Sequence, residues 1–253
     1  MKLALVQLAR ARTAEENRAR LLRLVEEARE ADLVLLSENW LGPFPVPLEY
    51  YLAALSEVAE RLRPGSLLAG GAQYVRDGDE LYSRGAFVCP SDGVLAWYEK
   101  RFPSQPVGER GHLTPGNKSG PVRWREWTVG ALVCVDLFYP ELARELALAG
   151  CDILLNPVSV PRERRSLWQA LGLARAAENT VYVAVANNTA SAYADGREIA
   201  GGSFVALPDG RLAAVAGREE TVLQVELDRQ KILRVRERWP YLEDARRLAD
   251  KGN

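Results

Sequence analysis

Residues 128–136 read Thr-Val-Gly-Ala-Leu-Val-Cys-Val-Asp, and this stretch indicates the class of fold. The apolar run Thr128–Val135 predicts a strand. The segment Tyr139–Ala149 predicts a helix, with Pro140 and Glu141 in its first turn. A strand that runs directly into a helix is typical of α/β folds. Cys134 lies at the junction between the two predicted elements.

The same alternation of strands and helices extends through both halves of the chain. The middle of the chain favours hairpins instead, because turn sequences such as Ser91-Asp92-Gly93 separate its strand-like runs. The pattern therefore predicts mixed sheets, two of them, with helices on their outer faces. The predicted strands are Lys2–Leu8, Asp32–Leu36, Leu67–Tyr74, Glu80–Cys89, Val94–Glu99, Ile153–Leu155, Val181–Ala186, Ser203–Leu207, Arg211–Val215 and Thr221–Glu226. Further helices are predicted over Ala14–Ala31, Leu48–Leu62, Arg162–Asn179 and most of the C-terminal segment, and Lys100–Gly120 is predicted to be a long irregular stretch.

Length and charge narrow the classes of function. A chain of 253 residues is long enough for one α/β domain, and a single domain over residues 1–253 is predicted. The net charge of −1 provides no excess of positive charge for nucleic acid or an anionic membrane, so neither partner is expected. The N-terminus has no signal-peptide pattern and no apolar run is long enough to span a bilayer, which predicts a cytoplasmic protein.

Cysteine and histidine usage argues against disulfide and metal chemistry. The three cysteines, Cys89, Cys134 and Cys151, form no CxxC pattern, which favours free thiols. His112 is the single histidine, so a histidine-based zinc site is not expected. We predict neither a metal nor another cofactor.

Cys134 is the candidate nucleophile. A thiol at the start of a helix faces free N–H groups and a partial positive charge, which lower a thiol pKa and can stabilise an oxyanion. The alternative is a buried structural cysteine, and that is the interpretation for Cys89 and Cys151. Only His112 could supply the histidine that cysteine hydrolases normally use, so carboxylates are the more numerous candidate bases.

Two charged residues follow predicted strands. Glu38 lies after Asp32–Leu36, at the end of the strand where open α/β sheets place their sites. Lys100 follows Val94–Glu99 and could stabilise an oxyanion as a fixed positive charge. The alternative for each is a solvated surface charge.

Three segments in order resemble the nitrilase, or carbon–nitrogen hydrolase, superfamily. Leu33-Val34-Leu35-Leu36-Ser37-Glu38 is similar to the family's apolar strand that runs into Pro-Glu. Tyr98-Glu99-Lys100, with Glu109 and Pro115-Gly116 downstream, is similar to its Tyr-x-Lys, glutamate and Pro-Gly. Cys134-Val135-Asp136-Leu137-Phe138-Tyr139-Pro140-Glu141 is similar to its Cys-Tyr-Asp-x-x-Phe-Pro-Glu. Weaker matches such as Asn156-Pro157 and Ala174–Asn179 extend the resemblance over nearly the whole chain.

Three departures from the family pattern stand beside the motifs. Ser37 replaces the usual proline, Arg101-Phe102-Pro103 replaces the usual His-Leu, and Val135 replaces the usual aromatic residue. None of them removes a catalytic group. They affect the assignment of the substrate more than that of the chemistry.

The resemblance implies a nitrilase-like four-layer α-β-β-α sandwich and a catalytic set. In this set Glu38 is the general base, Cys134 the nucleophile, and Lys100 with the backbone N–H of Val135 the oxyanion site. Glu109 resembles the second glutamate, which would hold Lys100 and contact the reacting groups; a structural salt bridge is its alternative. Glu141 has either a supporting role around the site or a helix-terminus role. The resemblance also implies a homodimer or a higher homo-oligomer, with a segment like residues 228–253 at the dimer interface.

The expected reaction is hydrolysis of small amides or carbamoyl amides through a thioester. A true nitrilase, an acyl transferase and an inactive partner-binding homologue stay open. Pocket walls are expected from Trp40–Tyr50, Arg101–Gly116 and Val158–Trp168. Arg162, Arg164 and Arg165 would either bind a substrate carboxylate or form a solvated face.

Overall fold

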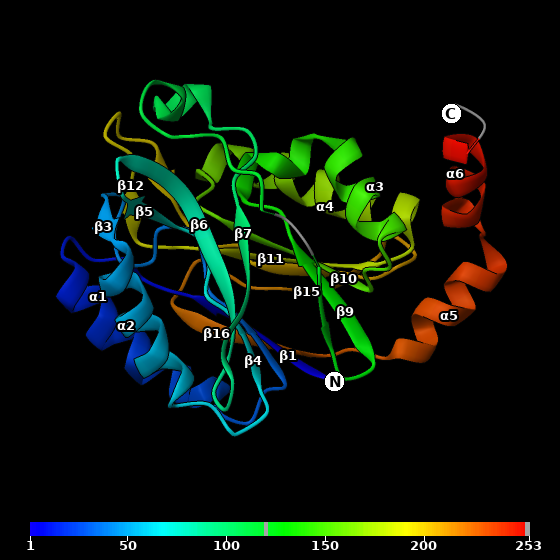
Figure 1. Cartoon of the computed structure of the whole chain (residues 1–253), viewed down its shortest axis with the longest axis horizontal. Coiled ribbons are helices and arrows are strands. Elements are labelled where there is room, and N and C mark those ends of the chain that lie inside the picture. The colour runs from blue at the N-terminus through cyan, green and yellow to red at the C-terminus, as the bar shows by residue number, and fades with distance from the viewer. Residues whose placement is uncertain (119–120, 251–253) are drawn as a thin grey trace.

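The computed structural model describes residues 1–118 and 121–250, without the side chains of residues 249 and 250. Gly120, which ends the predicted irregular stretch, and residues 251–253 of the C-terminal segment lie outside the described residues. Two β-sheets pack face to face, and helices cover both outer faces (Figure 1). The predicted four-layer α/β sandwich with two mixed sheets is therefore confirmed.

The first sheet comes mainly from the N-terminal half of the chain. Its strands are β1 (Lys2–Gln7), β2 (Leu33–Leu35), β3 (Val46–Pro47), β4 (Leu67–Ala69), β5 (Gln73–Asp77), β6 (Glu80–Cys89), β7 (Gly93–Glu99) and β16 (Thr221–Glu226). Their spatial order is β16-β1-β2-β4-β6-β5-β3, and β7 pairs with β6. The pairs β1–β2 and β2–β4 are parallel, while β16 and β6 run antiparallel to their neighbours, so the sheet is mixed.

The second sheet comes from the C-terminal half. Its strands are β8 (Val122–Trp124), β9 (Trp127–Ala131), β10 (Ile153–Val158), β11 (Tyr182–Asn187), β14 (Phe204–Ala206) and β15 (Leu212–Val215). The order is β15-β14-β11-β10-β9-β8, with parallel pairs only among β9, β10 and β11. A small hairpin of β12 (Ser191–Ala192) and β13 (Glu198–Ile199) lies outside both sheets.

The helices complete the layers. Residues of α1 (Ala14–Leu24) and α2 (Leu48–Ala59) share a buried cluster with the outer face of the first sheet, and α3 (Pro140–Leu148) and α4 (Arg165–Asn179) cover the second. The C-terminal α5 (Arg229–Arg238) and α6 (Tyr241–Asp250) extend to one side of the sandwich in Figure 1. Among the described residues, no helix has both the length and the apolar character needed to cross a membrane.

Strand β1 shows how the layers are encoded. Leu3 and Leu5 belong to the core between the two sheets, whereas Ala4 and Val6 belong to the cluster beneath α1 and α2. Successive side chains of a strand point to opposite faces, so an uninterrupted apolar run is what a strand buried on both sides requires.

The predicted single strand Leu67–Tyr74 is two strands, β4 and β5. The break falls at Gly70 and Gly71, and Gly71 has a φ of +67°. A Cβ at Gly71 would lie 2.1 Å from the carbonyl oxygen of Ser37, so only glycine fits there. The break brings Ala72 beside Glu38 in an isolated parallel bridge, next to the candidate site.

The predicted strand Thr128–Val135 also ends early, at Ala131. Cys134 has a φ of +50°, a left-handed conformation that is uncommon for residues other than glycine. It starts a short 3₁₀ helix over Cys134–Phe138 instead of ending a strand. Such backbone conformations are costly and concentrate at functional sites.

The helix predicted over Leu48–Leu62 ends at Ala59, and two other predicted helices contain 3₁₀ turns. The helix predicted over Ala14–Ala31 is α1 followed by a 3₁₀ turn at Val25–Ala28, and the one predicted over Arg162–Asn179 is α4 preceded by a 3₁₀ turn at Arg162–Arg164. Helices commonly tighten into 3₁₀ geometry at their ends, which hydrophobic periodicity does not reveal.

Candidate active site

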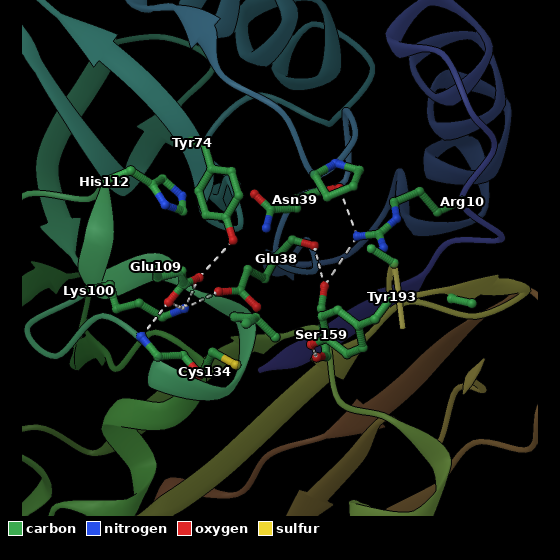
Figure 2. Close-up of a pocket in the computed structure, with 15 residues that line it drawn as sticks. Arg10, Glu38, Asn39, Tyr74, Lys100, Glu109, His112, Cys134, Ser159 and Tyr193 are labelled. Carbon is green, nitrogen blue, oxygen red and sulfur yellow. Dashed lines mark hydrogen bonds and ion pairs between the residues drawn. The ribbon is translucent and has the colours of Figure 1, made fainter. Parts of the chain in front are cut away.

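A cavity of about 250 Å³ opens at the carboxyl ends of strands from both sheets. Cys134, Glu38 and Lys100 all line it (Figure 2). Glu38 follows β2, Lys100 follows β7, and Cys134 follows β9, so three distant segments meet at one point. The other lining residues are Arg10, Asn39, Pro43, Tyr74, Ser104, Val107, Glu109, His112, Ser159, Ala192, Tyr193 and Ala194.

Lys100 lies between two carboxylates. Its Nζ is 2.8 Å from Glu38 Oε1 and 2.8 Å from both carboxylate oxygens of Glu109. All three residues are at most 3% exposed. A buried lysine is tolerated when carboxylates pair with it, and here the pairing also fixes the position of its ammonium group.

Further contacts hold Glu109 in place. The Tyr74 hydroxyl donates to Oε1 at 2.7 Å, and the backbone N–H of Ser104 donates to Oε2 at 2.6 Å. Glu109 is in a short 3₁₀ turn of the irregular segment after β7. These bonds occupy both of its oxygens, so Glu109 anchors Lys100 firmly.

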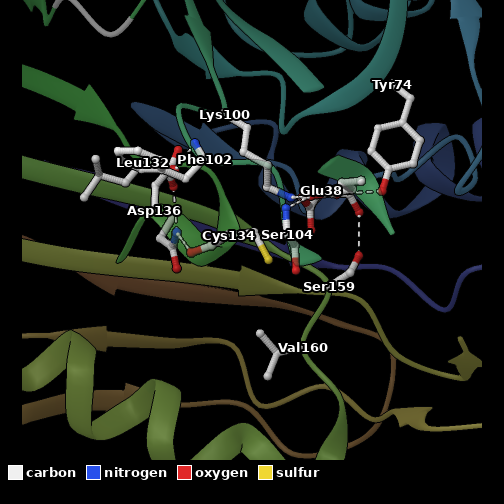
Figure 3. Close-up of polar contacts among 12 residues, drawn as sticks. Glu38, Tyr74, Lys100, Phe102, Ser104, Leu132, Cys134, Asp136, Ser159 and Val160 are labelled. Carbon is white, nitrogen blue, oxygen red and sulfur yellow. Dashed lines mark hydrogen bonds and ion pairs between the residues drawn. The ribbon is translucent and has the colours of Figure 1, made fainter. Parts of the chain in front are cut away.

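Cys134 is 7% exposed and faces the Glu38 carboxylate, close enough for a hydrogen bond from the thiol (Figures 2 and 3). The backbone N–H of Ser159 also faces the sulfur. Val135 follows in the first turn of the 3₁₀ helix, and its backbone N–H has no hydrogen bond within the described part of the chain. An unpaired N–H beside a nucleophile is suited to receive an oxyanion.

Burial and charge set the protonation states. Burial raises the pKa of the Cys134 thiol well above its usual range, and Glu38 adds to the effect. The expectation that the helix start lowers this pKa is not met, because one 3₁₀ turn cannot offset burial beside a carboxylate. Burial also raises the pKa of Glu38, although Lys100 opposes the shift. For Lys100 burial favours the neutral form, but Glu38, Cys134 and Glu109 outweigh it, so its pKa lies well above normal.

Further hydrogen bonds fix the backbone of the segments that carry the reacting groups. The carbonyl of Glu38 accepts hydrogen bonds from Ser159 Oγ at 3.1 Å and Asn188 Nδ2 at 2.6 Å. Asp136 accepts from the backbone N–H groups of Arg101 at 2.9 Å and Phe102 at 3.0 Å, as Figure 3 shows for Phe102. Asp136 therefore ties the segment that carries Cys134 to the segment that carries Lys100.

The structure brings Glu38, Lys100, Glu109, Cys134 and Val135 together, but not Glu141. Glu141 is exposed in the first turn of α3 and does not line the cavity, so its position fits the helix-terminus role. His112 lines the cavity edge-on to Tyr74 and is exposed. Within the described residues, no group of three or more His, Cys, Asp or Glu side chains could hold a metal ion.

Arg162, Arg164 and Arg165, which follow β10, make different contacts. Arg164 lines a second cavity of about 140 Å³, which Cys134 and Ser159 also line, and its guanidinium lies over Phe138 and Trp168. Arg162 pairs with Glu198, and Arg165 donates to the Ala200 carbonyl. The alternative of a shared solvated face therefore describes Arg162 better than Arg164.

Sequence reasoning missed several residues of the site. Arg10, Asn39, Tyr74 and Tyr193 line the cavity, and Asn188 supports it from behind, whereas Ser104 and Ser159 lie in the wall segments Arg101–Gly116 and Val158–Trp168 that the sequence predicts. Arg10 had one available signal, because it follows the predicted strand at its C-terminal end, as Glu38 and Lys100 do. The others come from turns and hairpins, whose placement depends on the assembled sheets.

A model of the carbon–nitrogen hydrolase family matches residues 2–237. The chain belongs to the carbon–nitrogen hydrolase family. An (R)-stereoselective amidase from Pseudomonas sp. is 33% identical, over 97% of this chain and 92% of the relative. The 2-oxoglutaramate amidase of Bacillus subtilis is 29% identical over 88% of each chain.

A solved carbon–nitrogen hydrolase relative has the same fold. It is a variant of an amidase from Nesterenkonia sp. AN1 in which acrylamide has added to the active-site cysteine. The structures superpose with a TM-score of 0.82, are 25% identical, and cover 100% of this chain and 99% of that one. The predicted superfamily and its hydrolysis of carbon–nitrogen bonds are thus confirmed at the level of the family.

Proposed function

We propose that this carbon–nitrogen hydrolase cleaves the amide bond of small, non-peptide molecules through a thioester on Cys134. The observation that carries the proposal is the buried contact of Lys100 with Glu38 and Glu109 beside that thiol. Burying these three charged groups is costly, and together they line the cavity that contains the thiol. A cavity of about 250 Å³ suits a small molecule better than a peptide.

In the first half-reaction, Glu38 accepts the thiol proton as the Cys134 sulfur attacks the amide carbon. The raised pKa of the thiol means that this proton leaves during the attack and not before it. Lys100 and the Val135 N–H stabilise the oxyanion of the tetrahedral intermediate. Protonated Glu38 then gives the proton to the nitrogen, ammonia or an amine leaves, and a thioester stays on the enzyme.

In the second half-reaction, Glu38 accepts a proton from water as the water attacks the thioester. The C–S bond breaks, the sulfur recovers a proton from Glu38, and the carboxylic acid leaves. Glu38 serves both halves because its carboxylate faces Cys134, while Ser159 and Asn188 hold its backbone carbonyl in place. The relatives support an amide substrate, since one is named a 2-oxoglutaramate amidase and another an (R)-stereoselective amidase.

A panel of small amides, carbamoyl compounds and nitriles, scored for ammonia and acid, tests the proposal. We expect amides to be hydrolysed, with mass spectrometry of quenched reactions showing an acyl adduct on Cys134. Turnover of nitriles alone would favour a true nitrilase, and product formation only with an added amine would favour acyl transfer.

Alkylation with iodoacetamide separates an enzyme from an inactive partner-binding homologue. Cys89 and Cys151 are buried internal controls. We expect Cys134 to react faster than either, because Glu38 can take its proton. Equal rates at all three thiols would favour the inactive homologue. The homodimer and the cytoplasmic location stay predictions, and light scattering of the purified chain tests the former.

A further inference from the structure

Arg10 is a buried cation in the wall of the cavity. It follows β1, is 6% exposed, and points into the site in Figure 2. One terminal nitrogen donates to the Asn39 carbonyl and to Ser159 Oγ, both at 3.3 Å. In the part of the chain that the structure describes, no carboxylate lies within 4.0 Å of its guanidinium.

Two other buried arginines show that this is unusual for the molecule. Arg84 lies 2.8 Å from Glu99, and Arg175 lies 3.0 Å from Glu178. Burial lowers the pKa of Arg10, which reflects the cost of its charge in that position. Arginine nevertheless stays protonated in proteins, so the cavity holds a positive charge that no carboxylate contacts among the described residues, although Glu38 acts on it from farther away.

Asn39 provides a second, independent sign of a polar ligand. Its side chain lines the same cavity, is 3% exposed, and makes no hydrogen bond among the described residues; Oδ1 is fully buried. Its backbone has a φ of +51°. Buried amides nearly always have partners, so an unpaired amide in a cavity wall is best explained by a ligand that completes its bonds.

Ser159 shows how close Arg10 lies to the nucleophile. Its hydroxyl contacts Arg10, while its backbone N–H faces the Cys134 sulfur. Ser159 therefore lies between Arg10 and the nucleophile and interacts with both. The cavity of 250 Å³ holds roughly eight water-sized groups. A ligand that spans from the sulfur to the guanidinium must be short.

We propose that Arg10 binds a carboxylate at the far end of the substrate, so that the substrate is a short monoamide of a dicarboxylic acid. The Asn39 amide contacts the same polar end. The proposal rests on the proposed amidase function for the identity of the scissile group. The planar guanidinium suits a carboxylate because it can donate two parallel hydrogen bonds to it.

The test compares glutaric acid monoamide with glutaric diamide, which has the same number of non-hydrogen atoms and no charge. The readout is the ratio of the two kcat/KM values, corrected for the two equivalent amides of the diamide. We expect the native enzyme to favour the monoamide by roughly 30-fold or more. Arg10→Gln should bring the ratio to within about threefold of one, and Arg10→Lys should give an intermediate value.

Arg12→Gln is the matched control. Arg12 is an exposed arginine that lines an outer cleft together with Arg10. We expect this variant to keep the native ratio. An equal fall in Arg12→Gln would mean that general positive charge, not contact with Arg10, attracts the anion. A native ratio near one, or an Arg10→Gln variant that slows both amides by the same factor, would also overturn the proposal.

A binding experiment separates this inference from the proposed function. Glutarate, the product, is titrated calorimetrically into Cys134→Ala and into Cys134→Ala with Arg10→Gln. We expect binding to weaken at least tenfold in the double variant. If no amide is turned over but glutarate binding still depends on Arg10, the proposed function fails and the anion site stands. If both variants bind glutarate equally and the native enzyme hydrolyses neutral amides, the proposed amidase function stands. The carboxylate site at Arg10 is then refuted.

Discussion

Lys100 Nζ lies 2.8 Å from Glu38 Oε1, and both side chains are almost completely buried. The two residues are 62 positions apart in the chain and come from loops after two different strands of the first sheet. The contact opposes the rise in the pKa of Glu38 that burial causes, although that pKa still lies above its usual value. A buried carboxyl whose pKa is raised is a stronger base than a solvated one, and it lies beside the thiol of Cys134 whose proton it would take.

Cys134→Ala should abolish turnover and leave the fold intact. Alanine fits the volume of the buried thiol and adopts the same backbone with equal strain. We expect kcat to fall by at least about 10³-fold, as when a nucleophile is removed. Ammonia release and the melting temperature measure the two effects. Activity close to that of the native protein would rule out the thioester mechanism.

Glu38→Gln should slow both half-reactions, because the same carboxylate serves each. Loss of a general base typically costs about 10²- to 10⁴-fold in rate. Rapid-quench kinetics separate acylation from hydrolysis of the thioester. Glu60→Gln, an exposed change at the end of α2, is the control. A normal acylation burst followed by normal turnover in Glu38→Gln would contradict its assignment as the base.

Glu109→Gln should reduce stability as well as activity. The change removes one of the two carboxylates that hold Lys100 and weakens the bonds from Tyr74 and Ser104. Breaking a buried ion pair from one side costs about 3–5 kcal/mol in unfolding free energy. Denaturant titration measures this loss, with Glu60→Gln as the reference. A change of stability below about 1 kcal/mol would show that the Lys100–Glu38 contact is sufficient alone.

Asp136 should make stability depend on pH between about 4 and 7. Burial raises the pKa of Asp136 to about 7, despite the N–H bonds it accepts from Arg101 and Phe102. A raised folded-state pKa means that ionisation disfavours the folded protein, so this contribution to stability is largest below the unfolded pKa and is lost as pH rises to about 7. The loss is roughly 4 kcal/mol, at 1.36 kcal/mol for each pKa unit.

Asp136→Asn isolates that contribution. We expect the unfolding free energy of the native protein, relative to the variant, to fall from pH 4 to pH 7 and to level off above it. Chemical denaturation of both proteins at each pH provides the measurement. A difference that grows with pH would show that the N–H bonds, not burial, dominate the titration of Asp136.

Local patterns in the sequence determine the layers and the reactive groups. The apolar run of Lys2–Gln7 specifies a strand buried on both faces, and the motifs around Glu38, Lys100 and Cys134 indicate the family and its chemistry. These features are readable because side-chain periodicity and short motifs depend only on neighbouring residues. The ends of the strands and helices are harder to predict from the sequence, as the break at Gly71 and the left-handed backbone of Cys134 show.

Only the tertiary structure decides which of those groups meet. Glu141 belongs to the same motif as Cys134 yet is exposed, while Arg10, far away in the chain, lines the cavity. Such contacts depend on the pairing of strands and the packing of two sheets, which join residues more than a hundred positions apart. Protonation follows the same rule: a helix start suggested a lowered pKa for Cys134, but burial beside Glu38 raises it, because desolvation is a property of the assembled core.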